Sequence, residues 1–338
     1  MKRLYGVLVC ALLVGALASW SAPTFAKSVS PVSPVNISMR VTKQTHSLYL
    51  PLIASGSAQG GNPPSKPTPT PIPNPGGVPN FSHVYTILLE NQEYGNIVGG
   101  SSAPYLNSLI AQYGLSTNFT GITHPSEPNY IALFAGSTQG TTSDGIYNLS
   151  AKNVADQMEA KGKTWKMFAQ NVPLNCFTGA TSTGGEDGSG TYARKHEPAI
   201  SFTDISGSPS RCANITDFTH FDPAAANYEF ITPNLCNDMH NCSIAMGDSF
   251  LKGFVPKILG SAAWQQGGVL FITWDEGLTN IGGGGHIATL VISKQVPAGF
   301  KSATAHNHYS ILKTIEDAWG LGCLANTCSA NNMAEFFH

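Results

Sequence analysis

Short apolar runs alternate with amphipathic segments from residue 78 to the C-terminus, and this alternation is the feature that most constrains the fold. Leu312, Ile315 and Trp319 repeat at helical spacing, whereas the strand candidates are predominantly apolar throughout. The strand candidates are residues 83–89, 199–202, 268–274 and 288–292, and the helix candidates are residues 104–113, 153–160, 248–263 and 309–319. This pattern predicts an α/β sheet of six or more strands, covered by helices on both faces.

The residues before this pattern predict export and a linker. Lys2 and Arg3 precede a short apolar run, and a small-residue cleavage site ends at Ala26, so residues 1–26 predict a signal peptide and a secreted or cell-surface protein. The apolar run is too short for a bilayer span of roughly 20 residues, which disfavours stable membrane insertion. Residues 27–56 stay unassigned, residues 57–78 form a Pro/Gly/Thr-rich linker, and residues 79–338 form one catalytic domain.

The composition disfavours two classes of protein, disordered chains and nucleic-acid-binding modules. The hydrophobic content of 42% is ordinary for a globular chain and disfavours intrinsic disorder. With 18 Lys and Arg against 20 Asp and Glu, the net charge of −2 provides no basic field for phosphate backbones. Nucleic acid is therefore not expected as a partner, and the oligomeric state is unknown.

The cysteines also indicate an oxidising compartment. Cys10 lies inside the predicted signal peptide, and the others are Cys176, Cys212, Cys236, Cys242, Cys323 and Cys328. An even set of six suits disulfides in an exported protein. Pairing of sequence neighbours would close small loops at 236–242 and 323–328 and leave the remaining two for each other, although six cysteines permit 15 connectivities.

Polar residues with metal-binding side chains follow the predicted strands. Glu90 and Asn91 directly follow the first one. Asp275 and Glu276 follow the clearest central strand, and a glycine run precedes His286. In doubly wound sheets, ligands bind beyond the carboxyl ends of the strands. Taken singly, each residue is as well explained as a solvated loop residue, but together they indicate a divalent-metal site.

Ser126 is the candidate nucleophile. It lies at or next to the start of a helix that continues through an apolar run at residues 131–136. Free backbone N–H groups and the helix dipole favour an anion there, so a phosphoryl group could be held while the hydroxyl attacks. The alternative is that Ser126 only caps the helix.

Seven segments together carry a family resemblance. They are ENQEY (90–94), HPSEPNY (124–130), RKHEP (194–198), NDMH (237–240), TWDEG (273–277), GH (285–286) and NHYS (307–310). Over about residues 82–320, the chain resembles the phosphoesterase family of bacterial and fungal acid phosphatases and phospholipases C. The resemblance implies an alkaline-phosphatase-like fold, with a central mostly parallel sheet and helices on both faces. It also implies a metal-bound nucleophile that becomes transiently phosphorylated.

The resemblance implies one metal site. Ser126 would be nucleophile and metal ligand, and the other ligands would be Glu90, Asn91, Asp275 and Glu276. Such an all-oxygen shell favours magnesium, manganese or calcium over zinc. The cation would activate the serine hydroxyl and draw charge off the phosphate oxygens.

The resemblance leaves the other half of the site open. His196, Asp238, His240 and His286 would form this half. Either Asp238 and histidines bind a second metal there, or the histidines contact the phosphate directly. Asp238 and His240 are two residues apart, whereas the corresponding residues of two-metal relatives are four apart, so the second metal stays uncertain.

Three further residues are candidates. His308 precedes the last helix and would either protonate the leaving oxygen or cap that helix. Asn148 follows Ser126 at about the place of a phosphate-binding asparagine in related pyrophosphatases, but a turn explains it equally well. Asn129 is expected beside the substrate, where it caps or braces the nucleophile turn.

The leading hypothesis is a secreted, metal-dependent, acid-phosphatase-like phosphomonoesterase. A phospholipase C-type phosphodiesterase is the alternative, and a phosphoinositide or phospholipid head group stays a candidate substrate. Phosphomonoesters are favoured because the chain is short and has no obvious apolar lip. A sulfatase is disfavoured because Tyr130 stands where its motif needs arginine, and a serine hydrolase because the Gly-x-Ser-x-Gly motif is missing.

The rival from another class is a catalytically inactive secreted binding protein with the same fold. A protein that only binds would not need Glu90, Ser126 and Asp275 together. Their joint presence therefore favours the enzyme.

Overall fold

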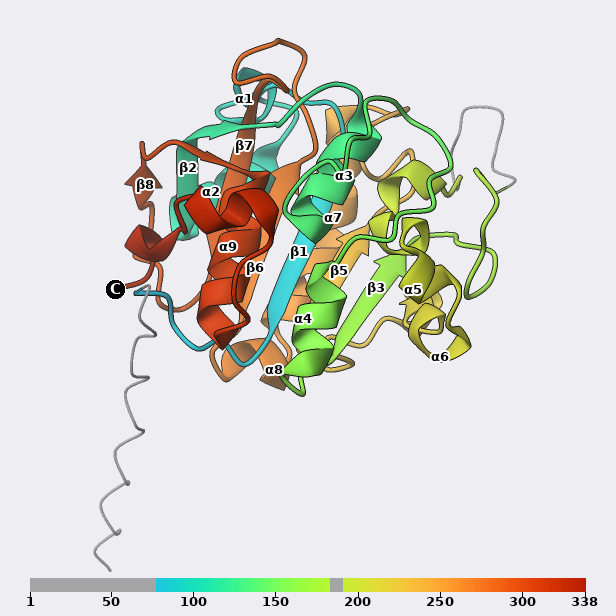
Figure 1. Cartoon of the computed structure of the whole chain (residues 1–338). Helices are drawn as coiled ribbons and strands as arrows, with labels where there is room; N and C mark the ends of the chain where they lie inside the picture. The colour runs from blue at the N-terminus through green and yellow to red at the C-terminus, as the bar shows by residue number, and fades with distance from the viewer. Residues whose placement is uncertain (1–76, 183–190) are drawn as a thin grey trace, which may run out of the picture. The chain divides into compact units, whose positions relative to one another are not determined.

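The computed structural model describes residues 77–182 and 191–338. The predicted signal peptide, the unassigned segment and the linker up to residue 76 lie outside the described residues. Val78 is already fully buried in the apolar core. The described residues form an α/β unit around a nine-stranded sheet (Figure 1).

The sheet is parallel apart from one strand. Its strands are β1 (Val84–Leu89), β2 (Gly114–Thr120), β3 (Trp165–Ala169), β4 (Ile215–Thr216), β5 (Tyr228–Thr232), β6 (Val269–Trp274), β7 (His286–Ile292), β8 (Lys301–Ser302) and β9 (His306–Asn307). Their order is β4-β3-β5-β1-β6-β7-β2-β8, and β9 pairs with β2. Only β7 runs antiparallel to its neighbours, β6 and β2, among the described strands. The prediction of a mostly parallel sheet is confirmed.

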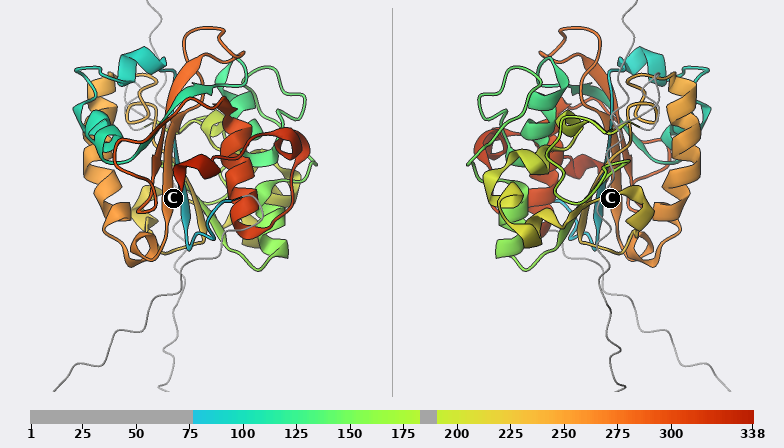
Figure 2. Two further views of the ribbon diagram at one scale, coloured as in Figure 1. Left: turned by 90° about the vertical axis from the view of Figure 1, so that its left-hand side faces the viewer. Right: turned by 90° about the vertical axis from the view of Figure 1, so that its right-hand side faces the viewer.

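Helices cover both faces of this sheet (Figure 2). The α-helices are α1 (Tyr94–Ile97), α2 (Pro104–Gln112), α3 (Ser126–Ala135), α4 (Val154–Ala160), α5 (Thr203–Ser206), α6 (Pro209–Cys212), α7 (Ile244–Leu259), α8 (Ala262–Gln265) and α9 (His308–Trp319). Short 3-10 turns are η1 (Arg194–His196), η2 (Pro198–Ser201), η3 (Phe218–His220), η4 (Ala325–Ser329) and η5 (Ala334–Phe336). Helices α3, α4 and α9 lie on one face, and α2 and α7 on the other. In the described part of the chain, no helix is both long and apolar enough to cross a bilayer.

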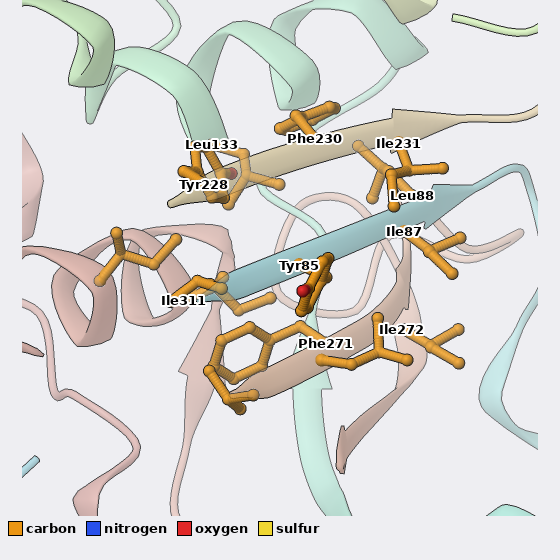
Figure 3. Packing of buried hydrophobic residues seen from close by; sticks show 14 of the residues in the cluster. Tyr85, Ile87, Leu88, Leu133, Tyr228, Phe230, Ile231, Phe271, Ile272 and Ile311 are labelled. Carbon is orange, nitrogen blue, oxygen red and sulfur yellow. The ribbon is translucent and has the colours of Figure 1, made fainter. Parts of the chain in front are cut away.

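The two central strands explain why the sheet needs cover on both faces. Every residue of β1 and β6 is buried, and the two strands pair in register from Val84 with Val269 to Leu89 with Trp274. Side chains of these strands, of β5 and of helices α3 and α9 pack together in the core (Figure 3). Burial of such side chains contributes roughly 1.5–3 kcal/mol each relative to exposure. The register also places the residues that follow β1 and β6 next to each other.

Two predicted elements differ from the structure. Residues 199–202 do not form a strand but belong largely to η2. Pro198 is the first residue of this turn, and the Glu197 side chain caps it, because Ile200 N donates to Glu197 Oε1 at 3.0 Å. The helix predicted at 248–263 is two helices, α7 and α8. Helix α7 is capped by Ser243 and begins at Ile244, four residues before the predicted start at residue 248. It ends at Leu259, and the chain turns at Gly260 before α8 begins.

Three disulfides join the six cysteines in the arrangement that sequence proximity favours. They are Cys176–Cys212, Cys236–Cys242 and Cys323–Cys328. The second closes a loop that contains Asp238 and His240, two of the predicted site residues. This loop is therefore anchored at both ends.

Candidate active site

The ends of β1 and β6 bring the first acids together. Glu90 follows β1 and donates its backbone N–H to Asp238 O at 2.8 Å, and Asp275 follows β6 and donates to Leu89 O at 2.9 Å. Asn91 N donates to Asp275 Oδ1 at 3.1 Å. Asn91 has φ 54°, a left-handed conformation that asparagine adopts more readily than most residues. The chain thus turns sharply after Glu90 and ties the two strand ends to each other.

Ser126 is the first residue of α3, and its hydroxyl points to the acids. Ser126 Oγ donates to Glu90 Oε2 at 3.0 Å and lies 3.4 Å from Glu276 Oε1. Pro125 occupies the N-cap position, and the side chain that caps the first turn is that of Asp144, whose Oδ1 accepts from Glu127 N at 3.0 Å. The alternative that Ser126 caps the helix is therefore wrong. Its hydroxyl stands at the helix N-terminus, where the dipole favours an anion.

The turn before Ser126 is braced from two sides. Asn129 accepts hydrogen bonds from Ile122 N and Thr123 N and donates to Thr123 O and Pro125 O. This is the bracing role expected for Asn129, and these hydrogen bonds use both the Oδ1 and the Nδ2 atom of its side chain. On the other side, the glycine run lies so close that a Cβ on Gly283 would sit 2.3 Å from Ile122 O. The glycines therefore allow the loop after β6 to pack against the nucleophile turn.

His196 lies between two acids. Its Nε2 is 3.1 Å from Glu90 Oε1, and its Nδ1 is 3.3 Å from Asp238 Oδ2. Its ring stacks on Tyr130 at 5.1 Å, and the Tyr130 hydroxyl donates to Glu90 Oε1. Burial, and then the charges of Lys195 and His240, hold the pKa of His196 well below its ordinary value. The ring is therefore neutral, with a nitrogen lone pair available to a ligand.

The acids of the site repel one another in a buried place. Burial raises the pKa of Glu90 well above its usual value, and the charges of Asp275 and Asp238 raise it further. Burial likewise raises the pKa of Asp238, and it raises the pKa of Asp275 to about 7 with the help of Glu276. So many carboxylates in one buried place are unfavourable unless a cation compensates their charge.

The donor set fits a divalent cation. Across residues 77–182 and 191–338, one set of three ligand-type side chains has ligand atoms within 4.8 Å of one another, and it consists of Glu90, His196 and His240. Three buried atoms at the site, His196 Nε2, Asp238 Oδ2 and Asp275 Oδ2, have no hydrogen-bond partner among the described residues. The approach of His196 to Glu90 is therefore close without being a hydrogen bond, as expected for two atoms that face a common cation. This nitrogen-containing set differs from the all-oxygen shell expected from the sequence.

Asp238 and His240 lie on the loop that the Cys236–Cys242 disulfide closes. His240 N donates to Asp238 Oδ1 at 2.8 Å, and the ring Nδ1 lies 2.5 Å from Asn241 Oδ1. This leaves His240 Nε2 facing the site, 3.4 Å from Lys195 Nζ.

The structure places two predicted residues away from this cluster. His286 stacks on Tyr94 at 4.3 Å, and its Nε2 lies 3.0 Å from Thr117 O, so its partners belong to α1 and β2. Asn148 is exposed beside the bridge between Leu149 and Phe202. Neither position supports the phosphate contact predicted for these two residues.

His308 is fully buried behind Asp275. Its Nε2 lies 2.5 Å from Asp275 O, and burial lowers the pKa of His308 to about 4. Asn307, not His308, caps helix α9. A neutral ring that donates to the Asp275 backbone favours a positioning role, whereas proton donation to a leaving group stays a prediction.

Sequence reasoning assigned no role to three residues that the structure places at the site. Lys195 Nζ lies between Asp144 Oδ2, at 3.0 Å, and His240. His124 Nδ1 lies 2.5 Å from Glu276 Oε2. Glu93 accepts hydrogen bonds from the backbone at Leu278, Thr279 and His286 and so fixes the loop after β6. All three belong to the segments that carry the family resemblance, and their position in these segments could have identified them as site residues from the sequence.

Comparison with known proteins finds a matching family model and relatives that are named phosphatases. The model of the phosphoesterase family matches residues 96–322. An acid phosphatase of Aspergillus fumigatus is 29% identical over 273 residues, which are 78% of this chain and 60% of the relative. A phosphatidylinositol-3-phosphatase of Mycobacterium tuberculosis is 32% identical over 246 residues, 72% of this chain and 79% of the relative. The chain thus spans less than two thirds of the fungal relative's length.

A solved structure resembles the fold. A protein of the alkaline phosphatase superfamily from Vibrio parahaemolyticus superimposes with a TM-score of 0.50 at 13% identity, covering 75% of this chain and 72% of that one. The expected alkaline-phosphatase-like fold is confirmed.

Proposed function

The chain belongs to the phosphoesterase family, and from this premise we propose that it is a metal-dependent phosphoric-ester hydrolase that acts through a phosphoserine at Ser126. The observation that carries the proposal is the position of Ser126 Oγ, 3.0 Å from Glu90 Oε2 at the N-terminus of α3. A hydroxyl at this place meets the acids that can take its proton, and it stands at the positive end of the α3 dipole, which attracts a phosphate.

The proposed reaction has two steps. Ser126 Oγ attacks phosphorus while its proton passes to Glu90 Oε2, the bond from phosphorus to the ester oxygen breaks, and the alcohol leaves with a proton from the solvent. Water then attacks the phosphoserine: its OH joins phosphorus, its other proton returns to the solvent, and the bond from phosphorus to Ser126 Oγ breaks. The proton on Glu90 Oε2 passes back to Ser126 Oγ, and inorganic phosphate is released. The alcohol and phosphate together contain the atoms of the ester and one water.

Residues of this chain would hold a divalent cation. Glu90, Asn91, Ser126, Asp275 and Glu276 form the proposed ligand set. When bound, the cation would supply Lewis acidity, which favours the serine alkoxide and neutralises phosphate charge. Oxygen ligands suit magnesium, manganese or calcium. His196 and His240 would contact the phosphate, or the two would hold a second cation together with Asp238. The closeness of the His196 and His240 ligand atoms to Glu90 supports the second cation.

Phosphomonoesters are the proposed substrates, with a phosphoinositide head group among them. The names of the two relatives support this choice, since both denote phosphatases. We also propose that residues 1–26 direct export and that residues 57–78 link residues 79–338 to the N-terminal segment. The three disulfides support an oxidising destination.

The test is hydrolysis of p-nitrophenyl phosphate by the full chain over acidic to mildly alkaline pH, with and without chelator. Chelator-sensitive turnover that Ser126→Ala abolishes is the expected result. Turnover of bis-p-nitrophenyl phosphate alone would establish the diesterase alternative instead. If the wild type hydrolyses neither ester with any added divalent ion, the hydrolase proposal fails and the inactive binding protein replaces it.

A further inference from the structure

A cavity of about 310 Å³ adjoins the candidate active site. Lys195 and His240 line it, and His240 is also one of the three residues whose ligand atoms cluster around Glu90. Its volume is at the lower end of the ~300–1,000 Å³ found for small-molecule sites. A phosphate held at the cluster would therefore leave the rest of its ester beside this cavity.

The walls of the cavity are largely apolar. The apolar side chains are those of Ile146, Ala180, Ala193 and Leu235, and the remaining lining residues besides Lys195 and His240 are Asp144, Gly145, Thr181 and Arg194. Small side chains at Ala180 and Ala193 leave the space open to an aliphatic or aromatic group. Apolar walls reward a ligand group in proportion to the apolar surface that it removes from water.

Ile146 is held in an exposed position at this cavity. Its side chain is 60% exposed. Its neighbours fix the loop: Gly145 N donates to Glu127 Oε2 at 2.7 Å, and Arg194 Nη2 donates to Tyr147 O at 3.2 Å. Asp144, the residue before Gly145, forms an ion pair with Lys195. The Ile146 side chain is therefore held at the wall of the cavity, where an apolar group that enters the cavity can contact it.

We infer that this cavity binds the alcohol portion of the substrate and that the protein prefers phosphomonoesters of apolar alcohols over those of small polar alcohols. The inference rests on the proposed phosphatase function and adds the substrate class. Ile146 and Ala180 are its specificity-determining residues. Ile146 contributes apolar contact, and the small Ala180 side chain leaves room.

The test compares 2-phenylethyl phosphate with glycerol 1-phosphate. Both are alkyl esters, so their leaving groups differ little in reactivity, and release of inorganic phosphate reports both reactions. The measured quantity is the ratio of kcat/KM for the apolar ester to kcat/KM for the polar one. We expect this ratio to fall about tenfold in Ile146→Ala and at least as far in Ala180→Leu, because one methylene in an apolar pocket is worth roughly tenfold or more.

Leu174→Ala is the matched control, since Leu174 is also 60% exposed but does not line the cavity, and its ratio should equal that of the wild type. Turnover of both esters with a ratio that neither cavity variant changes would overturn the cavity inference and leave the phosphatase proposal standing. A wild type that hydrolyses neither ester would instead overturn the phosphatase proposal, and the inference would fall with it.

Discussion

Ser126 Oγ donates a 3.0 Å hydrogen bond to Glu90 Oε2, although the two residues are 36 positions apart in the chain. The relationship joins the start of α3 to the end of β1, so it depends on the packing of that helix against the sheet. The first step of the proposed reaction begins at this pair.

Replacement of Ser126 by alanine removes the proposed nucleophile without adding bulk. We expect kcat for p-nitrophenyl phosphate to fall roughly a thousandfold or more. Ser108→Ala, on the exposed surface of α2, should behave like the wild type, because its hydroxyl only donates to Tyr105 O. Retention of more than a tenth of wild-type kcat in Ser126→Ala would argue against a phosphoserine.

Cation binding can be measured without activity. Because the folded site collects acids that the unfolded chain separates, added magnesium or manganese should raise the Tm of the wild type. At a cation concentration 100 times Kd, the stabilisation should be about 2.7 kcal/mol. Glu90→Gln removes a charged ligand, so it should respond weakly or not at all. An equal rise in both proteins would place the cation elsewhere.

His308 can be assigned to positioning or to proton transfer by its pH dependence. His308→Gln keeps a side-chain N–H that can reach Asp275 O, so it should retain much of the wild-type kcat, while His308→Ala should lose roughly tenfold. Burial lowers the pKa of His308 to about 4, so the ring is neutral at higher pH. A positioning role leaves the shape of the pH–rate profile unchanged in both variants. Disappearance of the alkaline limb in both would identify a proton donor.

The Cys236–Cys242 disulfide should matter for the site as well as for stability. Closing this short loop lowers the entropy of the unfolded chain. The free energy of unfolding rises as a result by roughly 2 kcal/mol at room temperature. The Cys236→Ser/Cys242→Ser variant should lose about that much stability, and its KM should rise because Asp238 and His240 lie inside the loop. Removal of the Cys323–Cys328 bridge is the control, which should lower stability but leave KM unchanged.

Glu335 links the C-terminal segment to two short strands. Glu335 Oε1 accepts from Ser302 Oγ and lies 2.7 Å from His306 Nε2. Burial opposes ionisation, but these hydrogen bonds hold the pKa of Glu335 below its ordinary value of 4.5. The bound carboxylate therefore stabilises the fold fully above pH 4.5, and this contribution is lost as the pH falls through the lowered pKa.

Glu335→Gln should accordingly reduce the free energy of unfolding by about 1 kcal/mol at neutral pH. Denaturant unfolding of both proteins across the acidic range measures the difference. The difference should shrink on acidification. A difference that grows as the pH falls would contradict the assignment.

The sequence by itself determined the features of the fold and the site that depend only on residues close together in the chain. Continuous apolar runs identified β1 and β6, because a strand buried on both faces needs apolar side chains throughout. The acids that follow them, the serine at a helix start and the disulfides between cysteines close in the chain could also be identified, because each is recognised from residues adjacent or close in the sequence.

Only the tertiary structure decided which of these residues meet. The strand order places β1 between β5 and β6, and the loop after β5 then brings Asp238 to His196 and Glu90. His286 instead turns toward Tyr94 and Thr117, although its place before a strand suggested the cluster. Periodicity records which face of an element is buried but not which element it is buried against. The composition of the site was therefore set by strand order and loop packing.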